Sequence, residues 1–220
     1  QVLLLSDVLC TSWHANEMGN VEAGQTVCVW GLGPIGLMTL AWYVIDLLMM
    51  FDCLVHIAAK LQLAGSLHRA KFRGAARLIG IDNEPHRLDV AKNKLGAQVI
   101  DFSKQDVIVR NHVASHCFFL IDFAMRSLEN DQELAPNGPD VCIEASGFRF
   151  AKSLTHKIQR ALKLETDTPE QLYECIYTVR KGGTVSVIAD YYNFCNGFPI
   201  GPFMEKGLTM RGGQALVQKY

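Results

Sequence analysis

Short runs of apolar, often β-branched residues alternate along this chain with longer stretches of helical periodicity. Such alternation is typical of a parallel sheet whose strands are connected by helices. With a glycine-rich turn after the first run, the pattern predicts an α/β fold: a doubly wound parallel six-stranded sheet of order 3-2-1-4-5-6, the Rossmann arrangement. The predicted strands are Thr26–Trp30, Arg77–Ile81, Gln98–Ile100, Asp140–Ala145, Thr184–Ala189 and Leu208–Arg211.

Two of the connecting stretches carry clear helix signals. Residues Glu84–Leu95 are amphipathic, and Gly96 follows them as a C-terminal stop. Residues Pro169–Val179 predict a second helix, with Thr168 as its N-cap and the proline in the first helical position.

The first predicted strand leads directly into a glycine-rich turn, Gly31-Leu32-Gly33-Pro34-Ile35-Gly36. A G-x-G-x-x-G pattern between a strand and a helix binds the pyrophosphate of a dinucleotide. Its first glycine permits the tight turn, the second lets backbone N–H groups approach the phosphates, and the third allows close packing of helix on strand. The helix N-terminus adds partial positive charge. We therefore expect contacts to a dinucleotide from Gly31, Gly33, Pro34, Ile35 and Gly36.

The acidic residue that binds the adenosine ribose lies about 20 residues after the glycine turn in such folds. Here the best candidate is Asp82, at the end of the second predicted strand and 46 residues beyond Gly36. Removing Tyr43–Arg69, a stretch of 27 residues, reduces this separation to 19. The sequence therefore predicts an insertion at 43–69. A second is predicted at about 111–132, where a single helix should connect the third and fourth strands.

The first predicted insertion is strongly apolar and admits more than one interpretation. Asp46, Asp52 and His56 interrupt it, and each would be unfavourable at the centre of a bilayer, so we expect no membrane span. An elongated helix or hairpin at the surface and sequence foreign to the fold, such as translated intron, are the favoured alternatives. A membrane tether through Tyr43–Ala64 is the third.

Composition and charge narrow the range of partners. The chain is 49% hydrophobic and 20% charged, with a net charge of −1 and no basic run, so neither nucleic acid nor an anionic membrane is expected. Its seven cysteines form no C-x-x-C pair, which argues against a zinc ribbon or a redox dithiol. We expect a reduced, cytoplasmic protein. Because the chain starts without an initiator Met or a signal peptide, we also expect a fragment.

Several segments resemble the coenzyme domain of zinc-dependent medium-chain alcohol dehydrogenases, most closely the glutathione-independent formaldehyde dehydrogenase-like branch. They are Val27–Met38, Ala70–Asp82, Gly96–Phe102 and Asp140–Gly147. The opening Leu4–His14 resembles that branch's "LSDILPTGWH" segment, and the ending Gly213–Tyr220 its "GQxPVxKY" segment. The resemblance makes residues 1–18 a remnant of a catalytic domain with its connecting helix, and residues 19–220 an NAD-binding Rossmann domain.

The resemblance implies an NAD-dependent oxidoreductase that moves hydride between nicotinamide and a small alcohol or aldehyde, with a catalytic Zn²⁺ that polarises the substrate oxygen. Asp7 is similar to a zinc ligand of that branch. The other ligands, a Cys and a His, belong to an N-terminal domain that this sequence lacks, and catalytic zinc needs about three protein ligands. We therefore expect zinc only where that domain is present, no catalytic residue in this chain, and an inactive fragment.

Further site residues follow from the resemblance and from the sheet. The resemblance places Thr11 near the nicotinamide and Arg87 beside the adenosine ribose. Ser146 and Gly147 follow the fourth predicted strand, at the carboxyl edge where such sheets bind ligands. The charge of Asp82 favours NAD over NADP, because a carboxylate disfavours a 2′-phosphate.

Two expectations concern association and an alternative function. The resembling family usually pairs its coenzyme domains through the last strand, which makes a homo-oligomer through Leu208–Arg211 possible. The alternative function is a non-catalytic dinucleotide-binding or interaction module. Its motivation is the missing zinc ligands and the apolar insertion, because large exposed apolar patches often mark interfaces.

Overall fold

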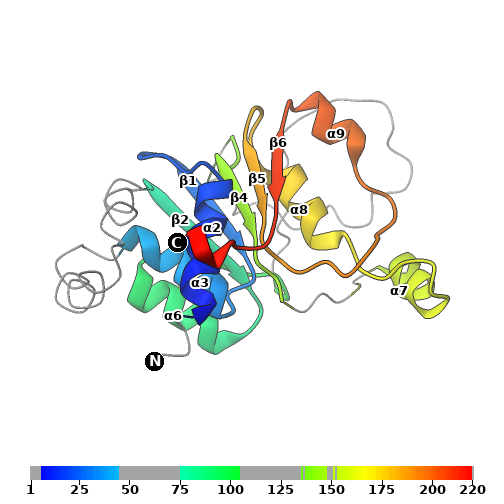
Figure 1. Cartoon of the computed structure of the whole chain (residues 1–220), viewed down its shortest axis with the longest axis horizontal. Helices are drawn as coiled ribbons and strands as arrows, with labels where there is room; N and C mark the ends of the chain where they lie inside the picture. Colours follow the sequence, from blue (N-terminus) through cyan, green and yellow to red (C-terminus); the bar gives the residue numbers. More distant parts are fainter. Residues whose placement is uncertain are drawn as a thin grey trace.

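The computed structural model describes residues 6–44, 75–104, 135, 137–147, 151 and 153–219. Its centre is one parallel sheet of six strands in the order β3-β2-β1-β4-β5-β6 (Figure 1). The predicted topology is therefore confirmed, and most strand ends differ from the prediction by one or two residues. The strands are β1 (Thr26–Trp30), β2 (Arg77–Asp82), β3 (Gln98–Asp101), β4 (Val141–Glu144), β5 (Thr184–Val187) and β6 (Thr209–Gly212).

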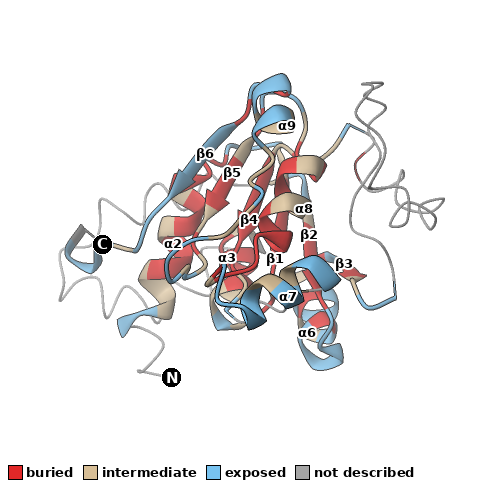
Figure 2. Ribbon diagram, turned by 90° about the vertical axis from the view of Figure 1, so that its right-hand side faces the viewer, coloured by how far each residue is buried: buried red, intermediate tan, exposed pale blue. Residues whose placement is uncertain are grey.

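Helices cover both faces of the sheet, so its central strands are buried between two layers (Figure 2). One face packs against α2 (Val8–Met18), α3 (Pro34–Val44) and α6 (Pro85–Leu95). The other face packs against α8 (Glu170–Thr178) and, through Phe203, against α9 (Ile200–Glu205). The remaining elements are α7 (Leu154–Ala161) and the short η2 (Val217–Lys219).

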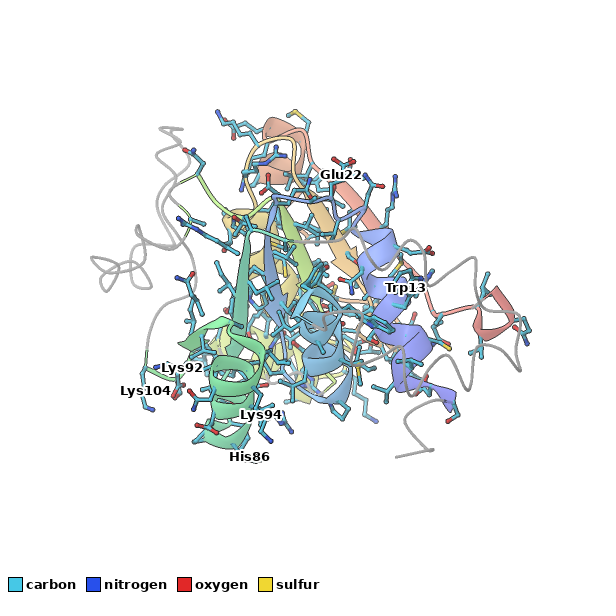
Figure 3. All side chains as sticks on the ribbon, turned by 90° about the vertical axis from the view of Figure 1, so that its left-hand side faces the viewer. Trp13, Glu22, His86, Lys92, Lys94 and Lys104 are labelled. Carbon is cyan, nitrogen blue, oxygen red and sulfur yellow. The ribbon has the colours of Figure 1, made fainter. Side chains whose placement is uncertain are left out.

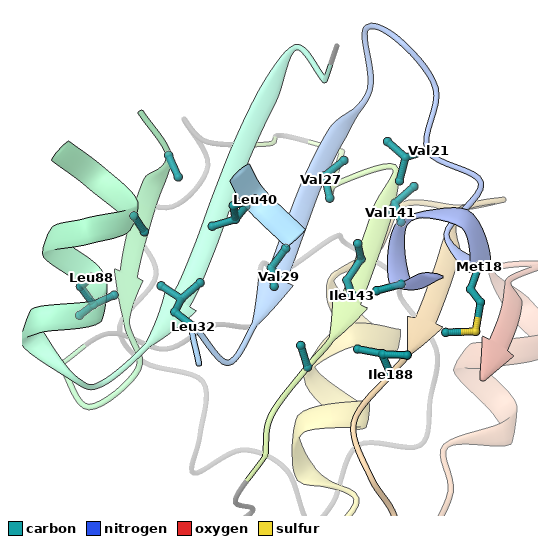
Figure 4. Close-up of a cluster of buried hydrophobic side chains, with 14 residues drawn as sticks. Met18, Val21, Val27, Val29, Leu32, Leu40, Leu88, Val141, Ile143 and Ile188 are labelled. Atoms are coloured by element: carbon teal, nitrogen blue, oxygen red, sulfur yellow. The ribbon is translucent and has the colours of Figure 1, made fainter. Parts of the chain in front are cut away.

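The alternation of side chains along β1 separates the two hydrophobic cores. Val27 and Val29 point into the core under α2, α3 and α6 (Figure 4), whereas Cys28 and Trp30 point into the core under α8. Successive strand residues face opposite sides of a sheet, so a strand buried on both faces is apolar throughout. This explains why β1 appears in the sequence as a continuous apolar run.

The ends of two helices test the sequence signals. Gly96 has φ 65° after α6, and its amide donates to the carbonyl of Ala91, so the predicted glycine stop is confirmed. The predicted N-cap of α8 is wrong. The structure places Pro169 (φ −85°, ψ 3°) at the N-cap, and within the described residues the buried Thr168 hydroxyl has no hydrogen-bond partner. The helix starts one residue later because its first backbone acceptor is the Pro169 carbonyl, which receives the amide of Tyr173.

The predicted first insertion overlaps the end of α3. Tyr43 and Val44 are the last two residues of that helix, and the Tyr43 hydroxyl donates to Oδ1 of Asn16 on α2. The start of the predicted stretch therefore belongs to the packed fold. Residues 45–74 and 105–134, which contain the rest of it and the second predicted insertion, lie outside the described residues.

Among the described residues, no helix combines the length and the apolarity needed to cross a bilayer. Most of the candidate tether, Tyr43–Ala64, lies outside them.

Candidate dinucleotide-binding site

The glycine turn after β1 needs glycine at two positions for steric reasons. Gly31 has φ +83°, and a Cβ there would lie 2.7 Å from the Cα of Ser146. A Cβ on Gly36 would overlap the carbonyl oxygen of Gly31. At Gly33, by contrast, a Cβ would meet no described heavy atom within 4 Å. The turn is thus closely packed at Gly31 and Gly36, whereas at Gly33 the described residues leave space. A phosphate could approach the backbone of the turn through this space.

The N-terminus of α3 presents backbone donors at this turn. The helix begins at Pro34, and the amide of Leu37 donates to the carbonyl of Gly33 at 2.9 Å. Proline has no N–H group, and the first amides of a helix have no intrahelical acceptor. The amides of Ile35 and Gly36 are therefore the donors that this helix end offers to an anion, and the helix dipole favours negative charge there.

Asp82 lies at the end of β2 with its carboxylate directed at backbone amides. Its side chain is nearly buried, and Oδ1 accepts from the amides of Asn83 at 2.7 Å and Glu84 at 2.9 Å. Oδ2 accepts from the amide of Leu32, inside the glycine turn, at 2.7 Å. The structure thus brings the predicted ribose acid against the predicted phosphate turn.

Arg87 lies in the first turn of α6, and its Nη1 atom is 3.5 Å from Oδ2 of Asp82. About half of its side chain is exposed, so water screens this ion pair, and such pairs contribute less than about 1 kcal/mol. The structure therefore places the partly exposed Arg87 side chain next to the carboxylate predicted to bind the ribose.

Ser146 and Gly147 follow β4 beside the glycine turn. The Ser146 amide donates to Oε1 of the fully buried Glu144 at 3.0 Å, which fixes the chain where it leaves the sheet. A Cβ on the exposed Gly147 would meet no described atom within 4 Å. These residues complete an edge formed by the ends of β1, β2 and β4.

Asp7 and Thr11 lie at the start of α2. The Thr11 hydroxyl donates to Oδ1 of Asp7 at 2.9 Å, while the Asp7 side chain makes no helix-capping hydrogen bond. Burial and the neighbouring Asp7 both raise the pKa of the Cys10 thiol. In the part of the chain that the structure describes, no group of three or more His, Cys, Asp or Glu side chains could hold a metal ion. One exposed aspartate does not make a zinc site, so these residues do not fit the metal by themselves.

The helix that carries Asp7 is fastened to α3 by a buried polar network. The Trp42 indole N–H donates to the Ser12 hydroxyl at 3.0 Å, and the Asn16 amide group donates to the carbonyl of Thr39 at 3.4 Å. Figure 3 shows Trp13 on the side of α2 that faces α3, where its ring lies edge-on to Trp42 with ring centres 5.1 Å apart. Helix α2 is thus held by α3, the helix that begins at the glycine turn.

Two residues of the candidate site, Leu32 and Glu144, were not predicted from the sequence. Leu32 contributes its backbone amide, for which no side-chain pattern exists. Glu144 is fully buried, at 0% exposure, within an otherwise apolar strand. A charged residue in a predicted apolar strand is a signal in the sequence that could have indicated a functional residue. Buried carboxylates are rare without dedicated hydrogen bonds.

No family model matches the chain. A zinc-type alcohol dehydrogenase-like protein of Schizosaccharomyces pombe is 41% identical over 218 residues, which are 99% of this chain and 41% of that protein. An alcohol dehydrogenase of Thermus sp. ATN1 has a similar fold, with a TM-score of 0.59 and 24% identity over 99% of this chain and 43% of its own. A putative zinc-binding dehydrogenase of Sinorhizobium meliloti, solved bound to NADP, matches with a TM-score of 0.58 and 18% identity over 97% of this chain and 45% of its own.

The sheet order and the glycine turn define the class: a Rossmann-type dinucleotide-binding domain. The sequence likeness then relates the chain to the coenzyme-binding part of the zinc-type alcohol dehydrogenase-like proteins. The chain spans less than half the length of these relatives.

Proposed function

We propose that this chain is the NAD-binding part of a zinc-dependent dehydrogenase that oxidises small alcohols or reduces the corresponding aldehydes. The observation that carries the proposal is the contact between Asp82 and the glycine turn, at the edge where β1, β2 and β4 end. That edge, at the point where the strand order reverses, is where such sheets bind ligands. Bound NAD would supply the nicotinamide ring that accepts or donates hydride.

The residues present fit a dinucleotide. The amides of Ile35 and Gly36 would hold the pyrophosphate, with the space over Gly33 leaving room for it. Oδ2 of Asp82 would accept a hydrogen bond from the adenosine ribose. Ser146 and Gly147 would line the path towards the nicotinamide, and by family likeness Thr11 would lie near that ring.

Asp82 also supports NAD as the cofactor rather than NADP. Its carboxylate is nearly buried beside the turn, where a 2′-phosphate would meet like charge at close range. Arg87 would attract a phosphate, but its guanidinium already lies on Asp82. The Sinorhizobium meliloti protein, 18% identical, was solved bound to NADP, so the proposed preference for NAD rests on Asp82 and not on the comparisons.

The zinc-dependent chemistry requires residues beyond this chain. Asp7 would contribute one ligand, and the others would come from the additional length that the relatives possess. We place the protein in the formaldehyde dehydrogenase-like branch on the similarity of the segments around Asp7 and after Gly213. Alone, this chain would bind NAD without transferring hydride.

The open edge of the sheet supports a homodimer. The residues of β6 are all exposed, and within the described residues β6 pairs only with β5. An edge strand with unpaired backbone groups is a template for pairing with another copy. We propose that two copies join through β6.

Calorimetric titration with NAD and NADP, together with absorbance at the nicotinamide band after adding alcohols, tests the proposed function. We expect NAD to bind more tightly than NADP and no alcohol to be oxidised by this chain alone. Equal affinity for both would contradict the role of Asp82, and binding of neither would contradict the proposal. The matches to dehydrogenases over nearly the whole chain do not favour a stand-alone interaction module.

A further inference from the structure

Leu32 is attached to β2 in two ways, although 50 residues separate it from Asp82 in the sequence. Its amide donates to Oδ2 of Asp82 at 2.7 Å, a length typical of a charge-assisted hydrogen bond. Its fully buried side chain lies over Gly80, where a Cβ would come within 3.0 Å of a leucine methyl group. The turn therefore rests on the end of β2 through both backbone and side chain.

The carboxylate of Asp82 has little hydrogen-bonding capacity left. A carboxylate offers about four acceptor sites, two on each oxygen. Oδ1 uses both for the amides of Asn83 and Glu84, and Oδ2 uses one for Leu32. The fourth faces Arg87 at 3.5 Å and is the site that a ribose hydroxyl could take. Most of the acceptor sites of this carboxylate are thus occupied by backbone amides of the protein without any nucleotide.

We propose that Asp82 is a positioning residue for the phosphate-binding turn, in addition to its role as ribose acceptor. Its carboxylate fixes Leu32, and through Leu32 the flanking glycines, relative to β2. Recognition of the phosphates therefore depends on the same side chain as recognition of the ribose. This inference rests on the proposed function, because it assumes that the turn binds pyrophosphate.

One consequence concerns cofactor exchange. Replacing Asp82 by a neutral residue removes the like charge that opposes a 2′-phosphate, but it also releases the turn. Such a replacement weakens NAD without yielding a good NADP site. The two effects are separable, because inorganic pyrophosphate contains no ribose and reports on the turn alone.

The test compares wild type with Asp82→Asn. In the variant the amide oxygen can serve either the two amides of Asn83 and Glu84 or that of Leu32, and the NH₂ group must face the other side. Two bonds outweigh one, so Leu32 loses its acceptor. The matched control is Asp101→Asn: Asp101 ends β3 in register with Asp82 and accepts the amide of Ser103, but it does not touch the turn.

The first readout is hydrogen exchange at the Leu32 amide without nucleotide. We expect about tenfold faster exchange in Asp82→Asn, with the amides of β1 unchanged and no effect in Asp101→Asn. The second is calorimetry with inorganic pyrophosphate and with ADP, where we expect at least about fivefold weaker binding of both. Should Asp82→Asn not fold, Asp82→Glu keeps the charge but displaces the carboxylate, and the same changes are expected.

Unchanged exchange at Leu32 would overturn the positioning role. So would unchanged pyrophosphate affinity together with weaker ADP binding, because Asp82 would then act on the ribose alone. A third outcome combines two results: the Leu32 amide exchanges faster in Asp82→Asn, but wild type binds neither pyrophosphate nor ADP. This outcome would overturn the link to phosphate recognition. That last outcome rejects the proposed function, while the structural contact itself is upheld.

Discussion

Gly31 and Ser146 are in direct backbone contact where β1 and β4 end. A Cβ added to Gly31 would lie 2.7 Å from Cα and 2.9 Å from the backbone nitrogen of Ser146. Together with the hydrogen bond from Leu32 to Asp82, this contact holds the glycine turn between the ends of β4 and β2. The turn is thus fixed on both sides before a ligand binds.

Gly31→Ala tests this contact. Alanine at φ +83° is strained, and its methyl group would meet backbone atoms that cannot move independently. We expect the free energy of unfolding to fall by about 2 kcal/mol or more, measured by urea denaturation. The matched control is Gly33→Ala, whose methyl group meets no described atom within 4 Å, and we expect a change below about 1 kcal/mol. Equal losses in the two variants would contradict the geometry of the turn.

Tyr43→Phe tests whether the end of α3 belongs to the fold or to an insertion. The change removes the hydroxyl that donates to Asn16 in the network between α2 and α3. We expect a loss of about 1 kcal/mol in the free energy of unfolding, with NAD affinity unchanged. Tyr192→Phe is the control, because that ring is 86% exposed. No difference between the variants would show that the Tyr43 hydroxyl contributes nothing to the stability of the fold.

The predicted insertion illustrates what can and cannot be predicted from the sequence. The displacement of Asp82 from its usual spacing predicts added residues, because in this fold the acid at the end of β2 lies about 20 residues after the glycine turn. The same argument does not show which residues of the stretch pack against the fold, since spacing only counts residues. The helix extends to Val44, and within its last turn the Tyr43 hydroxyl donates to Asn16 on α2.

Other elements show why the strands were easier to predict than the helices. A strand buried on both faces, such as β1, gives a nearly unbroken apolar run. All six predicted strands are present in the described sheet, including the exposed β6. In α7 the apolar Leu154 and Ile158 are 72% and 49% exposed, so its apolar side does not mark a core. In α2 the buried side includes Ser12 and Asn16, which hydrogen-bond across to α3. Hydrophobic periodicity predicts neither arrangement, because both depend on which polar groups meet in the folded chain.

Three fully buried thiols should make the protein less stable in alkali. Burial raises the pKa of Cys28, Cys142 and Cys175 above the usual 9.0, so these thiols stay protonated in the folded state while the unfolded chain ionises. The contribution of these thiols to the free energy of unfolding is fully present below pH 9 and is lost as the pH rises further. Each thiol should steepen the loss by about 1.4 kcal/mol per pH unit. Urea unfolding between pH 8 and 10.5 should show a smaller slope for Cys175→Ala, and an unchanged slope would contradict the burial.

Lys206 should act in the opposite direction over the same range. Burial lowers its pKa from 10.5 to about 8, while its Nζ atom donates to the carbonyls of Ile176 and Tyr177 at the end of α8. Between pH 8 and 10.5 the unfolded chain binds the extra proton, so this residue makes stability rise with pH. The free energy of unfolding of Lys206→Met should therefore fall more steeply with rising pH than that of wild type. A shallower fall would show that the amine is not desolvated.

The exposed edge at β6 predicts an assembly state. Met210 is 39% exposed on this strand, and a charge there should oppose pairing between two copies. Light scattering coupled to size exclusion should give a dimer for wild type and a monomer for Met210→Lys. Met204→Lys, on α9 and 72% exposed, is the control that should leave the mass unchanged. A wild type that is monomeric at all concentrations would contradict the proposed edge pairing.

The most direct test of the account is calorimetric titration of NAD into wild type and Gly33→Val. The valine side chain would project into the space over the turn that a pyrophosphate needs, while a Cβ at this position meets no described atom of the fold. We predict that wild type binds NAD, that the variant binds at least about tenfold more weakly, and that its free energy of unfolding is nearly unchanged. Equal NAD affinity in the two proteins, or no binding by wild type, would contradict the assignment of this turn as the dinucleotide site.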